Sequence, residues 1–459
     1  MKDFTQGNAT KHIVAFAAPM LIGNIFQQFY SMVDAIVVGN YVSGKALASV
    51  GTSATLLNFL IAILMGLTTG SSVVIAQFFG AKKTGDLKRA MSTSTLFLVG
   101  LSLLISMIGV IIAPNLLRML DVPAEIFPDA VTYLRILISG TLFTMTYNIY
   151  AAYLRALGDS KMPLYFLIGA TIINAVLDYV FVAILHTGVQ GAAYATIISQ
   201  AFSAIACFLY TRKKVPLIRI DKLIFDNKLL KLVLKYSIPA AIQLSITSLA
   251  GLTIMRLVNS FGTVSVAGYT ACMRIDAFAI MPVASVSMAI STFVAQNMGA
   301  GLEDRAKKGL KSAMLLMICL ALCVSAFVLA FGPQLISMFV DSADPDAAEI
   351  ISLGTRYLTT LGMFYVLFAV FFGYNGFFRG VGDAVIVMVL TIVSLTLRSV
   401  SAHVLASQFG MGVEAVAYSV PIGWGLCSIF AFFYYIKRRW AGKVAITVKK
   451  EEAAESAAT

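Results

Sequence analysis

Long apolar stretches alternate with short polar segments from near residue 12 to near residue 436. An α-helix needs roughly 20 apolar residues to cross the hydrocarbon of a membrane, and each stretch is about that long. We therefore predict an all-α polytopic membrane protein with twelve transmembrane helices. The predicted spans are 12–38, 52–78, 91–113, 130–154, 163–185, 190–211, 236–258, 268–296, 311–331, 352–378, 384–405 and 413–436.

The composition excludes most soluble folds. Hydrophobic residues make up 59% of the chain and charged residues 12%, whereas a soluble domain usually has about 25% charged residues. The net charge of +12 does not indicate a nucleic-acid partner, because the basic residues lie in alternating loops. All five cysteines fall inside apolar runs, so a disulfide framework is not expected.

The distribution of Lys and Arg predicts the orientation in the membrane. One set of alternate loops, with both terminal segments, carries 27 of these residues, and the other set carries 2, Lys45 and Arg118. Basic loops stay preferentially in the cytoplasm. We therefore expect a protein of the cell membrane with both termini cytoplasmic.

The two halves of the sequence repeat each other. Four motifs recur in the same order at an offset near 220 residues: Pro19 with Pro239, 76–81 with 295–300, 155–159 with 379–383, and 188–194 with 412–418. Because each half contains an even number of spans, the repeats are parallel, and a pseudo-two-fold axis along the membrane normal is expected.

This repeat predicts four parts of the chain. Residues 1–211 form an N-lobe of six helices, 236–440 form a C-lobe of six helices, and 441–459 form a cytoplasmic tail. The basic linker 212–235 is either an amphipathic helix on the membrane surface or a solvated connector. Two six-helix lobes suit a carrier that opens alternately to the two sides of the membrane.

Ionisable residues inside predicted spans are costly and ask for a reason. Asp34 lies near the outer end of the first span, and Asn174 and Asp178, four residues apart, share one face of the fifth. Thr196 adds a hydroxyl on the sixth span. Two carboxylates, an amide and a hydroxyl can bind a proton or Na⁺, since hard cations prefer oxygen ligands. Interhelical hydrogen bonding is the alternative role.

The predicted C-lobe contains its own charges, namely Arg256, Arg274, Asp276 and Arg398. Arg274 and Asp276 begin the eighth span and are expected to pair with each other or with the other two arginines. A structural ion-pair cluster is favoured over a substrate site. The sequence lacks Walker A, GxSxG, HExxH and CxxC motifs, so we expect neither an enzyme nor an ATP-driven pump, and no cofactor.

The sequence resembles the multidrug and toxic compound extrusion (MATE) family over essentially its whole length. The resemblance rests on the AAP sequence ending at Pro19, Asp34 within SMVDAIVVG, and the repeated motifs at 77–81, 155–159 and 296–300. It implies export of lipophilic or cationic small molecules by antiport with H⁺ or Na⁺. It also implies that Asp34, Asn174, Asp178 and Thr196 form the cation site.

Two further features bear on this resemblance. Spans 7 and 10 lack the carboxylates of NorM-type members, so a DinF/MepA-like branch is favoured. Pro19 is expected to weaken the first span, because proline removes a backbone hydrogen bond and clashes with the preceding turn. We expect a monomer in contact with membrane lipids. A lipid-linked oligosaccharide flippase of the wider superfamily and a channel remain the alternatives.

Overall fold

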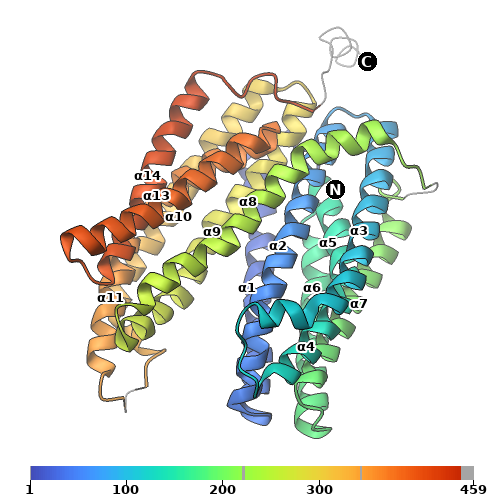
Figure 1. The fold of residues 1–459 in the computed structure, drawn as a ribbon. Helices are drawn as coiled ribbons and strands as arrows, with labels where there is room; N and C mark the ends of the chain where they lie inside the picture. Colours follow the sequence, from blue (N-terminus) through green and yellow to red (C-terminus); the bar gives the residue numbers. More distant parts are fainter. Residues whose placement is uncertain (1, 220–222, 342–343, 446–459) are drawn as a thin grey trace. The chain divides into compact units, whose positions relative to one another are not determined.

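The computed structural model describes residues 2–219, 223–341 and 344–445, and these residues form helices without strands (Figure 1). The first half contains α1 (Ala9–Tyr41), α2 (Gly44–Gly80), α3 (Thr84–Arg118), α4 (Phe127–Ser139), α5 (Thr141–Ala156), α6 (Lys161–Asp178), the π-helix η1 (Tyr179–Ile184) and α7 (Gly188–Lys214). The second half contains α8 (Asn227–Asn259), α9 (Thr263–Gly299), α10 (Glu303–Ser337), α11 (Ala347–Met363), α12 (Tyr365–Val381), α13 (Ala384–Phe409) and α14 (Glu414–Ile436).

These helices account for the twelve predicted spans. Among the described residues, ten helical stretches are long and apolar enough to cross a membrane, one of them being α6 continued by η1. The pair α11 and α12, bent by 51° at Phe364, adds an eleventh. The shorter α4 and α5, interrupted only at Gly140, cover the predicted span 130–154. The prediction of an all-α protein with twelve transmembrane helices is confirmed.

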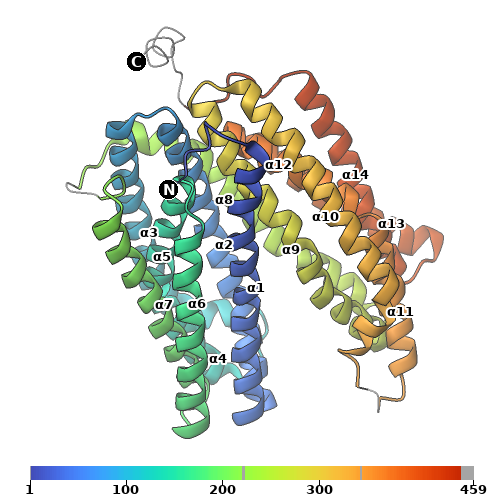
Figure 2. The same cartoon turned by 180° about the vertical axis from the view of Figure 1, so that it is seen from behind.

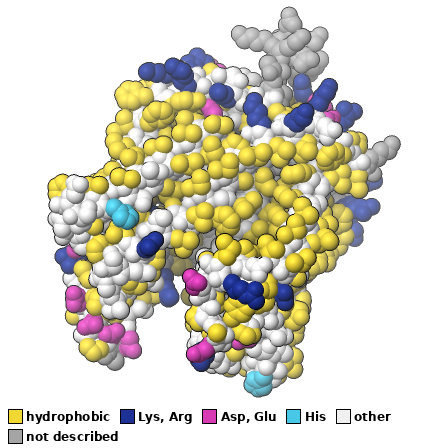
Figure 3. Space-filling model, in the orientation of Figure 1, with side chains coloured by type: hydrophobic (Ala, Val, Ile, Leu, Met, Phe, Trp, Pro, Cys, Tyr) yellow, Lys and Arg dark blue, Asp and Glu magenta, His cyan; other side chains and the backbone are white. Residues whose placement is uncertain are grey.

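The chain forms two compact units. Unit 1 contains Met1–Asp3 and Ala18–Ala241, and unit 2 contains Phe4–Ala17 and the chain from Ile242 onward. In unit 1, α7 packs against α4, α5 and α6; in unit 2, α9 packs against α10, α11 and α12 (Figures 1 and 2). On the visible face of each unit, hydrophobic side chains cover much of the surface, as membrane-spanning helices require (Figure 3). The lobe boundaries at 211 and 236 stay predictions.

Each of the helices α1 and α8 belongs partly to unit 1 and partly to unit 2, and the division lies close to Pro19 in α1 and close to Pro239 in α8. In α1, Gly23 lies against Leu164 and Leu167 of unit 1, but the residues up to Ala17 belong to unit 2.

In α8, Ser237 donates a hydrogen bond to the carbonyl of Leu67 in unit 1. Two turns later Gln243 donates to Thr391 in unit 2, at 3.0 Å.

The N-terminal segment is held on unit 2 by a repeat motif identified in the sequence. The Phe4 N–H donates to Gln296 Oε1 at 3.0 Å, and the Phe4 carbonyl accepts from Asn297 Nδ2 at 3.2 Å and from Arg305 Nε at 3.0 Å. The Phe4 ring packs on Phe16 and Phe293. The motif at 295–300 therefore has a packing role.

The connection between the halves is not one amphipathic helix over 212–235. Its two ends belong to α7 and α8, and residues 215–219 and 223–226 are not helical. Ser92 and Thr93 of α3 hydrogen-bond the backbone of Ile224 and Asp226, which fixes this non-helical segment against α3. Residues 220–222 of the predicted linker and 446–459 of the predicted tail lie outside the described residues.

Two glycines bring α2 and the first part of α8 into close contact within unit 1. A Cβ atom built on Gly66 would overlap the backbone of Ala241, and one built on Gly70 would overlap the backbone of Ser237. The glycines are four apart and lie on one face of α2, a spacing that lets helix backbones approach each other in membranes. Any side chain at these positions separates the two helices.

We expect Gly70→Leu to lower the stability of the protein by about 1–3 kcal/mol or to prevent folding, because the new side chain cannot fit. Gly51→Leu on the same helix is the matched control, since nothing lies within 4 Å of its Cβ position. Thermal unfolding of both variants in detergent measures the difference. Equal melting temperatures would show that the close contact does not contribute to stability.

Candidate functional site

The predicted polar residues of the first half come together in unit 1, where α1, α4, α6 and α7 supply side chains. Asn174 and Asp178 are fully buried on one face of α6. The α-helix ends at Asp178, and η1 begins with the next residue. A π-helical turn redirects the backbone, and such turns occur frequently at functional sites.

The two acids are close enough to influence each other. Asp34 Oδ2 accepts a long hydrogen bond from the hydroxyl of Tyr133 on α4, at 3.5 Å. Asp178 experiences the charge of Asp34. Two carboxylates whose charges act on each other in a low-dielectric interior repel when both are ionised. The prediction that Asp34 and Asp178 share one site agrees with this geometry.

Several polar atoms of this cluster have no hydrogen-bond partner among the described residues. They are Oδ1 of Asp34, both carboxylate oxygens of Asp178, and both side-chain polar atoms of Asn174. Burying an unpaired polar group costs about 1–3 kcal/mol, and a charged group costs more. A proton or a small cation in contact with these oxygens would remove that cost.

Thr196 joins the cluster through Ser199 and Tyr30. The Tyr30 hydroxyl lies 3.4 Å from Ser199 Oγ, and Ser199 Oγ donates to the backbone carbonyl of Thr196 at 2.9 Å. Tyr30, Tyr133 and Ser199 were not predicted as site residues. Tyr30 precedes Asp34 by four residues and Ser199 follows Thr196 by three, so helical spacing was an available signal for both. Nothing in the sequence indicated Tyr133.

The described residues contain no group of three or more His, Cys, Asp or Glu side chains that could hold a metal ion. A Na⁺ ion bound here would therefore depend on the two carboxylates together with neutral oxygens from Asn174 and Thr196. Such a ligand set consists entirely of oxygen atoms, which fits a hard cation. Sodium binding at these four residues stays a prediction.

The charged residues of the second half form a different arrangement from the one expected. Asp276 Oδ1 accepts a 2.8 Å hydrogen bond from Tyr365, and no ion pair joins Asp276, Arg256, Arg274 or Arg398 in the described part of the chain. The expected ion pair between Arg274 and Asp276 does not occur among the described residues, whereas Arg398, the other expected partner, acts on Asp276 through its charge. Arg274 and Asp276 are two positions apart on α9, so they do not share a helix face.

The three arginines of this group have different surroundings. Arg274 is exposed, with its guanidinium 5.8 Å from the ring centroid of Phe339, and Arg256 is exposed on α8. The Nε atom of Arg398 is buried without a hydrogen-bond partner among the described residues. Asp276 is therefore bonded by Tyr365, and the charge of Arg398 also acts on this carboxylate.

Pro19 lies inside α1, fifteen residues before Asp34, and α1 is helical on both sides of it. That separation corresponds to about 22 Å along a straight helix, so the proline is not part of the cluster. The expected bend at Pro19 stays a prediction.

Comparison with known proteins agrees with this architecture. The MatE family model matches residues 19–180 and 239–405, one match in each half. This chain belongs to the MatE family and is a membrane transporter of the MATE type.

Similar proteins match over nearly the whole chain. "Probable multidrug resistance protein YpnP" of Bacillus subtilis (strain 168) is 31% identical and covers 97% of this chain and 99% of its own length. "Multidrug export protein MepA" of Staphylococcus haemolyticus is 23% identical, with coverage of 96% and 97%. A solved structure described as "Crystal structure of MATE in the straight conformation" has a TM-score of 0.86 at 25% identity, covering 95% of this chain and 97% of that one.

We expect Asp178→Asn to raise the thermal stability by about 1–3 kcal/mol, because it removes a buried charge that has no partner. Thermal unfolding in detergent without Na⁺ measures it.

Asp159→Ala is the comparison variant, because it removes an acid that has hydrogen-bond partners. Asp159 Oδ1 accepts the N–H groups of Lys161 and Met162 at the start of α6, and losing such a cap should cost about 0.5–2 kcal/mol. A clear loss of stability in Asp178→Asn would instead assign Asp178 a structural role.

Proposed function

We propose that this protein is a secondary multidrug efflux transporter that exports organic cations or amphiphilic compounds by antiport with H⁺ or Na⁺. The observation that carries the proposal is the pair of acids in unit 1, Asp34 and Asp178: Oδ1 of Asp34 and both carboxylate oxygens of Asp178 are buried without a hydrogen-bond partner among the described residues. The names of the relatives, which include multidrug resistance and multidrug export proteins, support the substrate class.

The coupling follows from charge. With both acids ionised, their repulsion and burial oppose the arrangement that brings α1 and α6 together. A bound proton or Na⁺ removes that cost, so it stabilises the arrangement in which α1, α6 and α7 bring the two acids together relative to the arrangement in which they are separated. A cation drives transport only if one state binds it more tightly than the other, because equal affinity shifts no equilibrium.

Exchange with the substrate then requires competition. A cationic substrate is favoured by ionised Asp34 and Asp178 and disfavoured once a coupling cation has neutralised them. Entry of H⁺ or Na⁺ from outside therefore releases the substrate to the outside. The charge bias of the loops supports this orientation, with both termini in the cytoplasm and the protein in the cell membrane. A monomer is sufficient for this scheme, since one chain supplies all four residues.

We expect Asp34→Asn and Asp178→Asn to abolish gradient-driven export while leaving the protein folded, because each removes a charge with little change in volume. Dye efflux from proteoliposomes, with H⁺ and Na⁺ gradients imposed separately, measures this and identifies the coupling ion. Asp129→Asn is the matched control, because this exposed acid lies in the first turn of α4, outside the cluster.

Arg398→Ala is expected to reduce folded yield and not coupling, if Arg398 is structural. Full efflux by both Asp34→Asn and Asp178→Asn at normal expression contradicts the proposal. Conductance in planar bilayers would favour a channel, and movement of lipid-linked oligosaccharide without dye efflux would favour a flippase.

A further inference from the structure

Unit 1 contains an apolar cavity of about 350 Å³ between α2, α3 and α4, away from the acidic cluster. Its wall is made of aliphatic side chains, one phenylalanine and a glycine. Residues 56–63 of α2 and 104–116 of α3 supply most of it, and Leu134 and Ile138 of α4 complete it. Voids of this size are rare in close-packed protein interiors, so the cavity suits an occupant.

The cavity opens toward the surface of α3. Leu104 and Ile108 line it and are 53% and 47% exposed, respectively. Since α3 is a membrane-spanning helix, its exposed aliphatic face meets lipid chains. The lining residues lie in the part of α3 that leads to Arg118, the end predicted to be outside. The opening therefore faces the outer half of the bilayer.

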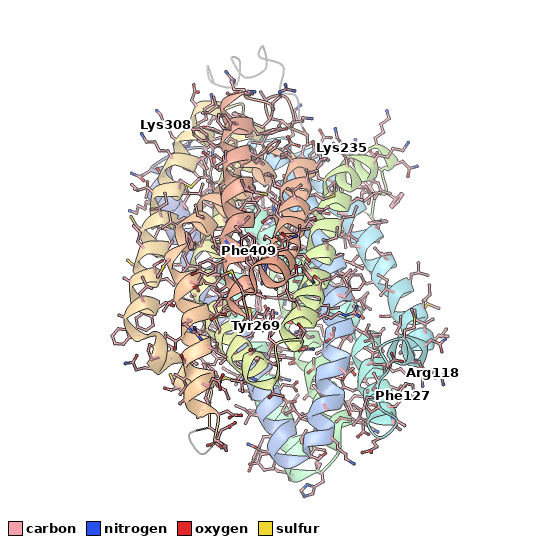
Figure 4. The ribbon with its side chains drawn as sticks, turned by 60° about the vertical axis from the view of Figure 1, so that its left-hand side comes forward. Arg118, Phe127, Lys235, Tyr269, Lys308 and Phe409 are labelled. Carbon is pink, nitrogen blue, oxygen red and sulfur yellow. The ribbon has the colours of Figure 1, made fainter. Side chains whose placement is uncertain are left out.

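Two arginines without carboxylate partners lie at this end of the unit. Arg135 follows Leu134 of the cavity wall, is exposed, and donates from Nε to the Val110 carbonyl at 3.1 Å. Arg118 lies over the Phe127 ring, 5.7 Å from its centroid, at the end of α3 (Figure 4). Neither forms an ion pair with a described residue, whereas nearby Lys45 pairs with Glu125 at 2.6 Å.

We propose that this cavity binds an acyl chain of an anionic phospholipid from the outer leaflet, with the phosphate at Arg135 and with Arg118 adding positive charge at the same end of the unit. An apolar wall offers no polar group to orient a drug-like solute, which such pockets usually provide. The two arginines repel organic cations and attract a phosphate. A phospholipid matches both features at once.

The bound chain would also support the acidic cluster through α4. Leu134 faces the cavity, and the preceding residue, Tyr133, donates to Asp34. An acyl chain that fills the space behind α4 fixes the position from which Tyr133 reaches the acid. Binding of the lipid itself does not depend on the proposed transport activity.

The test uses the full chain in vesicles of phosphatidylglycerol and phosphatidylcholine, with a phosphatidylglycerol that carries a photoreactive diazirine on its acyl chain. Mass spectrometry should locate adducts in 56–63 and 104–116. Ile112→Trp fills the cavity and should reduce these adducts about tenfold. Ile111→Trp is the matched control, because Ile111 is 73% exposed on the same helix and does not line the cavity.

Two more variants complete the design. Arg135→Gln should weaken the preference for phosphatidylglycerol over phosphatidylcholine while labelling in pure phosphatidylcholine is retained. Leu104→Trp fills the cavity from its other end and replaces Ile112→Trp if that variant does not fold. Labelling that is unchanged by either tryptophan would show only annular lipid and overturn the proposal. Loss of labelling on addition of a lipophilic cation would assign the cavity to a transported compound instead.

Discussion

The absence of water from the hydrocarbon interior is the constraint on which the rest of this structure depends, because every polar group there must find a partner within the protein. Helices satisfy the backbone, and many hydroxyls bond back to their own helix, as Thr68 does to Leu64 and Ser71 to Leu67. Among the described residues, the buried polar atoms without a hydrogen-bond partner include a cluster in unit 1 that contains oxygens of Asp34, Asn174 and Asp178. Because leaving these oxygens unpaired costs free energy, binding of a cation to them is favourable without an additional ligand.

The two halves share a sequence repeat but treat their acids differently. In unit 2, Asp276 accepts a short hydrogen bond from Tyr365. In unit 1, Asp34 has only a long contact with Tyr133 and Asp178 has no partner. The two halves thus kept the same order of helices after duplication. Their side chains diverged: Asp276 in unit 2 has a close hydrogen-bond donor, whereas Asp34 and Asp178 in unit 1 do not. Responsiveness to a cation is expected mainly where the pairing is poorest.

Sequence periodicity predicted what depends on local chain geometry. Apolar length gave the spans, and a separation of four residues placed Asn174 and Asp178 on one helix face. Contacts between helices were harder to predict, since the direction of a side chain depends on packing. Tyr133 beside Asp34, and Tyr365 in place of Arg274 beside Asp276, are examples. The break at Gly140 and the π-helix after Asp178 leave no signal in hydropathy.

The exchange of helix segments between units affects biosynthesis. Unit 2 includes Phe4–Ala17, which are synthesised before all of unit 1 from Ala18 onward, yet the rest of its chain begins only at Ile242. Unit 1 in turn requires the start of α8, from the second half of the sequence. Unit 1 cannot be completed before the start of α8 is synthesised, and Phe4–Ala17 must wait for the helices that follow Ile242. An ancestor with a single repeat would meet the same need only as a dimer that exchanged these segments.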